Sequence, residues 1–187
     1  MRKHQQRLPL LLAAVFSAAT QANEPSPSPG LDVLENFVGR WQGTATAYFP
    51  RQPERESRHE QVQASCEKAL EGTYVECRSI WTDTNGATRE LRMFWNFHAR
   101  EDRFEILYLY DNWPGKVQYK IEYNADTGTL TGRDSFQGPG GVEAEEIVSW
   151  TFAEDGQAIT STEQNHYVSD PEGQWHVSFE FQWQRHE

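Results

Sequence analysis

The chain has 187 residues, of which 28 are acidic and 17 are basic, giving a formal net charge of -11. A field of this sign repels nucleic acid and anionic lipid surfaces and would favour cationic or neutral partners, so we predict no nucleic-acid partner. We favour solubility over the steering of a partner as the role of this charge. Aromatic residues make up 13% of the chain, which is enough to build the core of one domain of this length.

The first 22 residues have the composition of a secretory signal peptide. Three basic residues precede an apolar stretch from Leu8 to Ala19, which is too short to span a bilayer, and small residues lead to a cleavage point after Ala22. We therefore predict residues 1–22 to be a signal peptide. The product is expected to be exported, either periplasmic or secreted, with no stable membrane insertion after cleavage. An uncleaved anchor is the alternative, and the short apolar stretch disfavours it.

Cleavage would remove the three basic residues of the leader and lower the formal net charge of -11 by three, to -14. The segment that follows, residues 23–30, is rich in proline and serine, and we predict a disordered tail there. Residues 31–187 then form one domain on length alone. A short helical turn from Leu31 to Phe37 is expected before the first strand.

Apolar residues in the remainder of the chain recur at every second position, which is the period of a β-strand. The clearest example runs from Val117 to Tyr123, where apolar and polar residues alternate strictly. Between two other such segments, Asn85-Gly86 is a strong hairpin signal. The pattern predicts about ten strands, in the ranges 41–49, 56–68, 73–82, 89–98, 104–110, 117–123, 130–136, 142–152, 158–166 and 175–185.

Strands and turns at this spacing, with no helical pattern between them, predict an all-β fold. We expect a single antiparallel up-and-down β-barrel of about ten strands, because closing the sheet leaves few exposed edges. A sandwich of the immunoglobulin type is less favoured, because it needs longer crossovers and usually cysteines that bridge two sheets.

The two cysteines, Cys66 and Cys77, flank a turn in a chain expected to enter an oxidising compartment. With Glu71-Gly72 as a two-residue loop, Cys66 lies directly opposite Cys77, at the wider spacing of a hydrogen-bonded pair. We predict a cross-strand disulfide between them. Redox catalysis is not expected, because the chain has no Cys-x-x-Cys motif.

Two short motifs resemble those of the calycins, the superfamily of lipocalins, fatty-acid-binding proteins and their bacterial ten-stranded relatives. The first is Phe37-Val38-Gly39-Arg40-Trp41-Gln42-Gly43, and the second is the terminal Phe179-x-Phe181-x-Trp183-x-Arg185. The resemblance implies a barrel whose first strand opens with Gly39 and Trp41, with Trp41 inside the base and Arg185 packed over it. A cation–π contact between those two side chains would close the base of the barrel.

The start of the domain, together with Leu70-Glu71-Gly72-Thr73-Tyr74-Val75, is also similar to small exported lipocalin-like proteins of unknown function. It is more weakly similar to the nitrobindin group of haem barrels. The chain departs from fatty-acid-binding proteins, because it lacks their terminal Arg-x-Tyr and has no helical lid after the first strand. The late residues His166 and His176 stand in surroundings unlike those of the nitrobindin haem ligand.

Aromatic residues on the strands are the best candidates for a ligand site, because their rings and tyrosine hydroxyls suit a mostly apolar molecule. A barrel of ten strands tends to leave interior room, although the same side chains can simply fill it. The candidate cavity residues are Trp95, Phe97, Tyr108, Tyr110, Tyr119, Tyr123, Phe179 and Phe181.

Other side chains give no catalytic or metal motif, so we predict no catalytic residue, metal or cofactor. The histidines lack the spacing of metal ligands, and we expect His98 to face solvent or a rim. Glu143, Glu145 and Glu146, near Asp134, could pair for acid–base chemistry. A run of charges of this kind is usually a solvated strand face, and we favour that interpretation.

These observations predict an exported, non-enzymatic protein that binds a small hydrophobic or aromatic molecule inside a β-barrel. Three alternatives stay open. In the first, the barrel binds haem or another tetrapyrrole. In the second, it acts as a small isomerase or cyclase and has an inward acid or histidine of shifted pKa. In the third, it serves as a surface interaction module with a filled core.

Overall fold

The computed structural model describes residues 29–137 and 141–186, without the side chains of Pro29, Trp113 and Pro114. The predicted signal peptide and most of the predicted tail lie outside this part of the chain. The elements are α1 (Pro29–Glu35), β1 (Gly39–Ala47), β2 (Arg58–Ala69), β3 (Tyr74–Asp83), β4 (Thr88–His98), β5 (Arg103–Tyr110), β6 (Trp113–Asn124), β7 (Thr129–Gln137), β8 (Glu143–Phe152), β9 (Ala158–Tyr167) and β10 (His176–His186).

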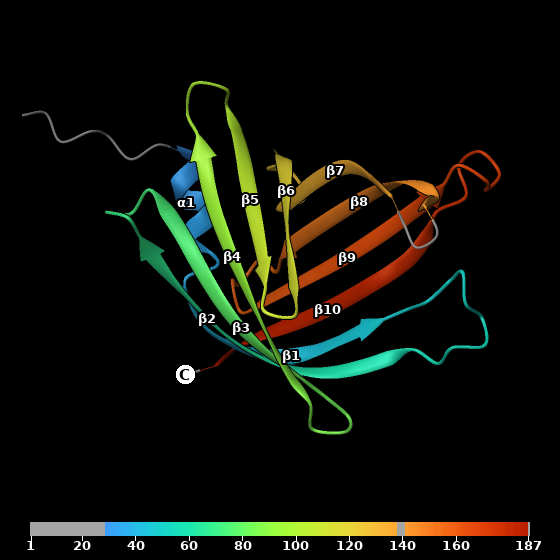
Figure 1. The fold of residues 1–187 in the computed structure, drawn as a ribbon. Coiled ribbons are helices and arrows are strands. Elements are labelled where there is room, and N and C mark those ends of the chain that lie inside the picture. The colour runs from blue at the N-terminus through green and yellow to red at the C-terminus, as the bar shows by residue number, and fades with distance from the viewer. Residues whose placement is uncertain (1–28, 138–140, 187) are drawn as a thin grey trace, which may run out of the picture.

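The ten strands form one closed antiparallel barrel, which confirms the predicted fold class (Figure 1). Each strand pairs with its neighbours in the chain, and β1 pairs with β10 to close the sheet. In that closing pair, Trp41 lies directly opposite Arg185. Up-and-down connectivity therefore pairs both edges of most strands. The β6–β7 ladder is the short one, confined to Ile121–Asn124 and Thr129–Gly132.

The two ends of the barrel differ. Helix α1 and the C-terminus lie at one end, and the β1–β2 and β9–β10 loops project from the other (Figure 1). We call these the helix end and the loop end. Helix α1 packs against β4. Behind it, the Phe37 ring stacks on Trp95 with their centroids 4.4 Å apart.

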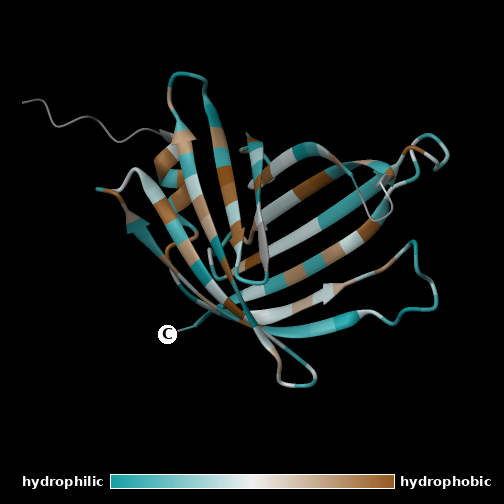
Figure 2. Ribbon diagram, viewed as in Figure 1, coloured by the Kyte–Doolittle hydropathy of each residue, from teal (hydrophilic) through white to brown (hydrophobic). Residues whose placement is uncertain are grey.

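Side chains alternate between the barrel interior and the outer surface, as the period of a strand requires. Hydrophobic and hydrophilic residues accordingly alternate along most strands (Figure 2). In β3, Val75, Cys77, Ser79 and Trp81 are buried inside, whereas Arg78 between them is exposed. The core is thus the barrel interior, and its largest fully buried side chains are Trp41, Trp81, Trp95, Trp150 and Trp183.

Three local features differ from the sequence prediction. Helix α1 begins at Pro29, so the last two residues of the segment predicted as a tail, residues 29 and 30, are helical. Strand β6 begins at Trp113, four residues before the predicted range, because the β5–β6 ladder continues through Tyr110 and Trp113 across a register shift. The β2–β3 connection has four residues rather than two, since Ala69 pairs with Tyr74.

The disulfide is present between Cys66 and Cys77, which lie directly opposite each other in the β2–β3 ladder. Their Cα atoms are 4.0 Å apart. This is the narrow spacing of a non-hydrogen-bonded pair, so the expectation of the wider spacing was wrong. Within the described residues, no helix is both long and apolar enough to cross a membrane.

Candidate functional site

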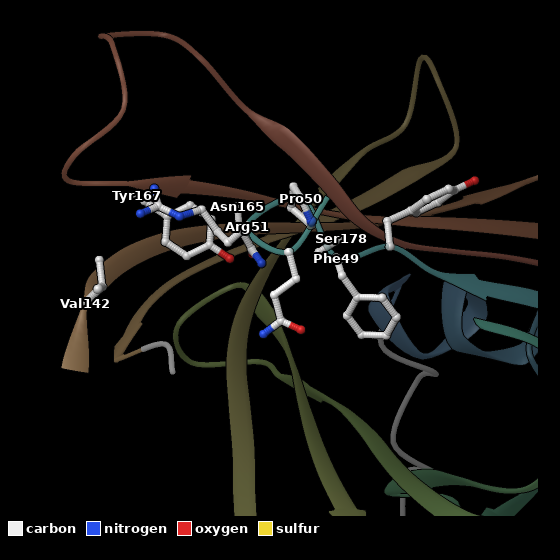
Figure 3. A pocket seen from close by; sticks show the side chains of 9 residues that line it. Phe49, Pro50, Arg51, Val142, Asn165, Tyr167 and Ser178 are labelled. Atoms are coloured by element: carbon white, nitrogen blue, oxygen red, sulfur yellow. The ribbon is translucent and has the colours of Figure 1, made fainter. Parts of the chain in front are cut away.

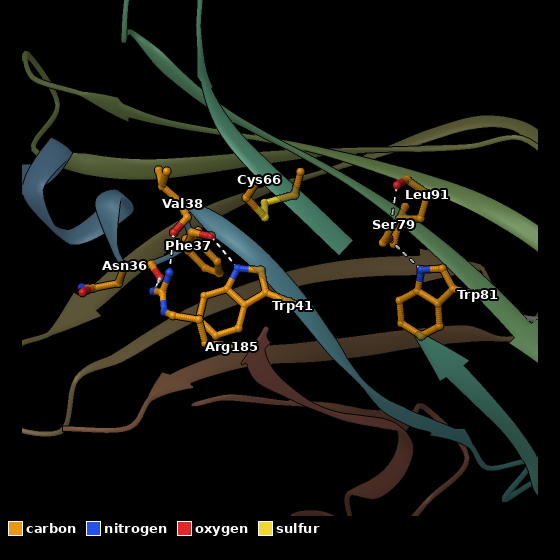
Figure 4. The surroundings of a disulfide bond; sticks show 10 residues. Asn36, Phe37, Val38, Trp41, Cys66, Ser79, Trp81, Leu91 and Arg185 are labelled. Carbon is orange, nitrogen blue, oxygen red and sulfur yellow. Dashed lines mark hydrogen bonds between the residues drawn. A yellow bond between two sulfur atoms is a disulfide. The ribbon is translucent and has the colours of Figure 1, made fainter. Parts of the chain in front are cut away.

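The helix end of the barrel is closed by Trp41 and Arg185. The Arg185 guanidinium carbon lies 4.3 Å from the centroid of the Trp41 ring (Figure 4). Its Nη1 donates to the carbonyl of Val38 at 2.7 Å, and its Nη2 donates to the carbonyl of Asn36 at 3.2 Å. The Trp41 indole donates in turn to the carbonyl of Phe37 at 2.7 Å. The end of helix α1 and both closing strands are therefore joined at one point.

Gly39 makes this closure geometrically possible. Its φ of +137° lies in a region that other residues rarely adopt, and a Cβ at this position would come within 2.4 Å of Arg185 Nη1. Gly39 also pairs with Cys66, so the buried disulfide lies beside the same floor (Figure 4). A ligand inside the barrel would have to enter away from this closed end.

The eight candidate aromatic residues all lie on strands that line the barrel, but they separate into two groups. Phe97 and Tyr123 lie near the helix end, where they line a pocket beside α1 together with Phe104. Trp95 lies deeper in the same half and is in edge-to-face contact with Trp150, with ring centroids 4.8 Å apart.

The second group lies toward the loop end. The Tyr108 ring has its centroid 6.2 Å from that of Tyr110 and 6.0 Å from that of Tyr119. On the closing strand, Phe179 and Phe181 both contact Trp81, with ring centroids 5.5 Å and 6.2 Å from it. An aromatic wall therefore lines the interior of the loop-end half.

Two carboxyl groups share this half with the tyrosines. On β8, Ala144, Val148 and Trp150 are buried inside, and Glu146 falls on the same inward face. On β9, Ile159, Ser161, Asn165 and Tyr167 are buried inside, and Glu163 is on that face too. The structure thus corrects the interpretation of the acidic run in β8. Glu143 and Glu145 are exposed, as expected, but Glu146 points into the barrel.

Glu146 and Glu163, which we call the acid pair, lie on adjacent strands. Glu146 is directly opposite Asn165, and Glu163 is two positions from Asn165 on the same face. The two carboxylates are therefore diagonal neighbours, a relationship that places Cα atoms about 7–8 Å apart. Tyr119 Oη donates a hydrogen bond to Glu146 Oε2. The Asn165 amide is oriented so that its oxygen accepts from Ser178 Oγ at 3.3 Å and its Nδ2 donates to Glu146 Oε1 at 3.2 Å.

The interior environment disfavours negative charge on the acid pair. Burial and, to a lesser extent, repulsion from Glu146 raise the pKa of Glu163 to about 8. Attraction by Arg89 opposes this shift. Burial also raises the pKa of Glu146, although the Tyr119 hydrogen bond opposes the shift and Asp134 adds to it. Burial likewise raises the pKa values of the Tyr108, Tyr110 and Tyr119 hydroxyls. At neutral pH the tyrosines are therefore neutral.

A separate ion pair occupies the same end of the barrel. Arg89 donates two hydrogen bonds to Glu60, from Nε to Oε1 at 3.0 Å and from Nη2 to Oε2 at 2.7 Å. The Arg89 guanidinium also lies 4.8 Å from the Trp81 ring centroid. Glu60 is only 4% exposed, so this bidentate geometry stabilises a buried carboxylate.

A pocket of about 350 Å³ opens at the loop end, and we call it the mouth pocket. The β1–β2 loop forms one side with Phe49, Pro50 and Arg51, and the Arg51 side chain extends over the ring of Tyr167 on β9 (Figure 3). Asn165 belongs both to this pocket and to the acid pair's hydrogen bonds. Its lining residues are Tyr48, Phe49, Pro50, Arg51, Gln52, Val142, Asn165, Tyr167 and Ser178.

Sequence reasoning missed Glu163, Asn165, Arg89 and Glu60. The sequence did contain a pattern that indicates Glu146, because this residue alternates in step with the apolar residues Ala144, Val148 and Trp150 of the inward face. The inward face of β9 is mixed in polarity, so alternation alone did not mark Glu163 or Asn165 as interior residues.

A family model described as Protein of unknown function (DUF1579) matches residues 26–185. No curated protein matches the chain. Because the match extends from the start of helix α1 to the end of the barrel, this chain belongs to the DUF1579 family.

Proposed function

We propose that this protein is an exported binding protein of calycin type, which holds a small and mostly apolar or aromatic molecule inside its barrel. The observation that carries the proposal is incomplete packing of inward side chains in the loop-end half. Tyr110, Phe179 and Glu163 point inward and yet are only half-buried, whereas Trp41, Trp95 and Trp183 at the other end are fully covered. Side chains arranged in this way are typical of the wall of a ligand cavity.

The entrance and the compartment also support the proposal. Asn165 lines the mouth pocket and also donates to Glu146, so the pocket adjoins the acid pair. The disulfide between Cys66 and Cys77 fits an oxidising compartment, where such bonds form and persist. The ten-stranded closed barrel and the contact of Arg185 with Trp41 support the calycin assignment.

Binding can be tested by fluorescence titration with nile red, a neutral dye that emits in apolar surroundings. Glu163→Trp would fill the interior beside Val148 and Phe179, and Gln164→Trp adds the same bulk to the outer face of the same strand. We expect wild type and Gln164→Trp to bind the dye alike and Glu163→Trp to lose most of the affinity. Equal binding by all three folded proteins, or no binding by any, would contradict an interior site.

An acid–base enzyme is the second candidate, and the acid pair favours it. Glu163, with its pKa of about 8, can exist in both protonation states near neutral pH, which suits a general acid or base. The isomerase or cyclase alternative requires such an inward acid. The two functions differ in what happens to a bound molecule, which a carrier releases unchanged and an isomerase releases as a rearranged product. NMR spectra of the molecule before and after incubation with the protein would separate them.

Histidine positions give the haem alternative less support. Among the five described histidines, His59, His98, His166 and His186 occupy outward positions on their strands. His176 is opposite the inward Asn165, but it lies at the rim, where its Nε2 is 3.2 Å from Asp170 Oδ2. An absorption spectrum after incubation with haemin would show a shifted band if the haem alternative is correct.

A further inference from the structure

The charges inside the loop-end half do not balance. Arg89 is the cation that acts on Glu163, yet Glu60 already holds its guanidinium with two hydrogen bonds. Arg58 also lies against Glu60, with Nε 3.6 Å from Oε1. Within residues 29–137 and 141–186, no lysine or arginine forms an ion pair with Glu146 or Glu163.

Hydrogen bonds to the acid pair are also incomplete. Glu146 accepts from Tyr119 and Asn165. For Glu163, the forces that act on the carboxyl group are burial, Glu146 and Arg89, and no described residue donates a hydrogen bond to it. A carboxylate that is half-buried with neither cation nor donor is costly, because nothing replaces the part of its water shell that it has lost.

The groups around Glu163 are otherwise neutral or apolar. Its direct neighbours across the ladders are Val148 on β8 and Phe179 on β10. The hydroxyls of Tyr108 and Tyr110 on β5 and of Tyr119 on β6 lie within its electrostatic reach. Asp134 on β7 acts on Glu146 and adds further negative potential. The tyrosine rings and Phe179 present faces that attract a cation.

A second, independent feature is an unpartnered donor deeper in the same interior. The Trp150 indole nitrogen has no hydrogen-bond partner among the described residues, and its side chain is 1% exposed. Trp150 follows Glu146 on the inward face of β8, and its ring stacks near Tyr108 with centroids 6.3 Å apart. The interior thus has a pair of carboxyl groups toward the mouth and a buried donor further in.

We propose that the loop-end half of the barrel binds an organic ammonium ion with an aromatic or apolar body, its ammonium group between Glu146 and Glu163 and its body against the aromatic wall toward Trp150. The proposal rests on the proposed binding function and adds the chemical class of the ligand. An ammonium group supplies both the missing cation and the missing donors. The formal net charge of -11 would also draw a cation toward the protein.

Binding of this kind is coupled to proton release. An ammonium ion beside Glu163 favours the carboxylate and lowers its pKa from about 8. At neutral pH the carboxyl proton therefore leaves to solvent as the amine binds. Affinity should rise as the pH approaches 8, because progressively less free energy is needed to ionise Glu163.

Isothermal titration calorimetry with tryptamine and tryptophol tests the proposal. The two compounds share an indole-ethyl body, and tryptamine carries an ammonium group where tryptophol carries a hydroxyl. For wild type at neutral pH we expect tryptamine to bind about tenfold or more tightly than tryptophol. Titrations in buffers of different ionisation enthalpy should report proton release with tryptamine alone.

Glu163→Gln and Glu146→Gln should each remove most of the preference for tryptamine, and the exposed Glu145→Gln should retain it. Having two variants keeps the test valid if one fails to fold. Equal affinity of wild type for tryptamine and tryptophol, or an amine preference that survives in Glu163→Gln and Glu146→Gln, would overturn the proposal. Failure of both indoles while nile red still binds inside would overturn the amine proposal alone. If nile red fails as well, the binding function itself is wrong.

Discussion

Glu163 on β9 and Glu146 on β8 face the same barrel interior as diagonal neighbours across one ladder, with Asn165 directly opposite Glu146. The arrangement raises the pKa values of both carboxyl groups, mainly through burial. The folded protein therefore binds protons that the unfolded chain releases, at a place that adjoins the mouth pocket. Stability and ligand affinity are both expected to depend on this pair.

The first prediction concerns stability against pH. Between the ordinary pKa of 4.5 and the folded value of about 8, the folded state holds the Glu163 proton more tightly than the unfolded state does. The Glu163 contribution to stability therefore falls as the pH rises through this window and is constant above it. Glu163→Gln, which cannot ionise, should match wild type near pH 4 and be more stable at pH 9.

The size of that gap follows from the shift, at about 1.4 kcal/mol for each unit of pKa difference, so we expect a few kcal/mol at most. Urea unfolding at several pH values measures it. Exposed Glu145→Gln is the matched control and should track wild type throughout. A Glu163→Gln variant that is less stable than wild type at pH 9 would show that the carboxylate is favourably placed.

The second prediction concerns the floor of the barrel. Trp41 is 2% exposed and is held by Arg185 and by the carbonyl of Phe37. Trp41→Ala should lower the free energy of unfolding by about 3–5 kcal/mol, as expected when a large buried aromatic is removed. The exposed neighbour Gln42→Ala should change it by about 0.5 kcal/mol or less. A loss below about 1 kcal/mol for Trp41→Ala would mean that the floor does not depend on this ring.

The third prediction separates backbone strain from steric contact. Gly39 and Gly86 both have positive φ, at 137° and 83°. A Cβ on Gly39 would meet Arg185 Nη1, whereas a Cβ on Gly86 would meet no atom within 4 Å. Gly39→Ala should therefore cost about 1–3 kcal/mol more than Gly86→Ala, because it also displaces the hydrogen-bonded Arg185. Chemical denaturation of both variants tests this, and equal losses would leave backbone strain as the whole effect.

The fourth prediction concerns the disulfide between Cys66 and Cys77, which are separated by 11 residues in the sequence. A crosslink closing a loop of this length stabilises a protein by about 3 kcal/mol in the chain-entropy model. Reduction of the wild type should lower the urea midpoint accordingly. The double variant C66A/C77A should show no response to the reductant. If the urea midpoint of the wild type is the same with and without reductant, the prediction is contradicted.

The strand pattern could be predicted from the sequence because most strands bury one face. All ten strands lie within a few residues of the predicted ranges, and the resemblance at Gly39, Trp41 and Arg185 pointed to residues that meet at the floor. The start of β6 could not be predicted, because Pro114 and Gly115 there have the composition of a turn.

The acid pair shows where sequence patterns lose their power. Glu146 stands in a run of three glutamates, and only its parity with Val148 and Trp150 separates it from the exposed pair. Glu163 stands in β9, where Ser161 and Asn165 share its inward face, so no hydrophobic alternation reveals the interior. The interactions of Glu60 with Arg89 and of Asn165 with Glu146 join separate strands, and only the closed barrel brings them together.

The central claim is that a small molecule binds inside the barrel, and the tryptophan indole N–H signals in an NMR spectrum test it most directly. Trp95, Trp150 and Trp183 are fully buried inside the barrel, and their indole N–H groups lack partners in the described part of the protein. Trp175 lies outside the barrel strands, beside His166. On titration with tryptamine or nile red, we predict that the Trp150 signal shifts most, while the signal of Trp41, whose indole is hydrogen-bonded at the floor, stays in place. A shift confined to Trp175, with the three interior signals unchanged, would contradict an interior binding site.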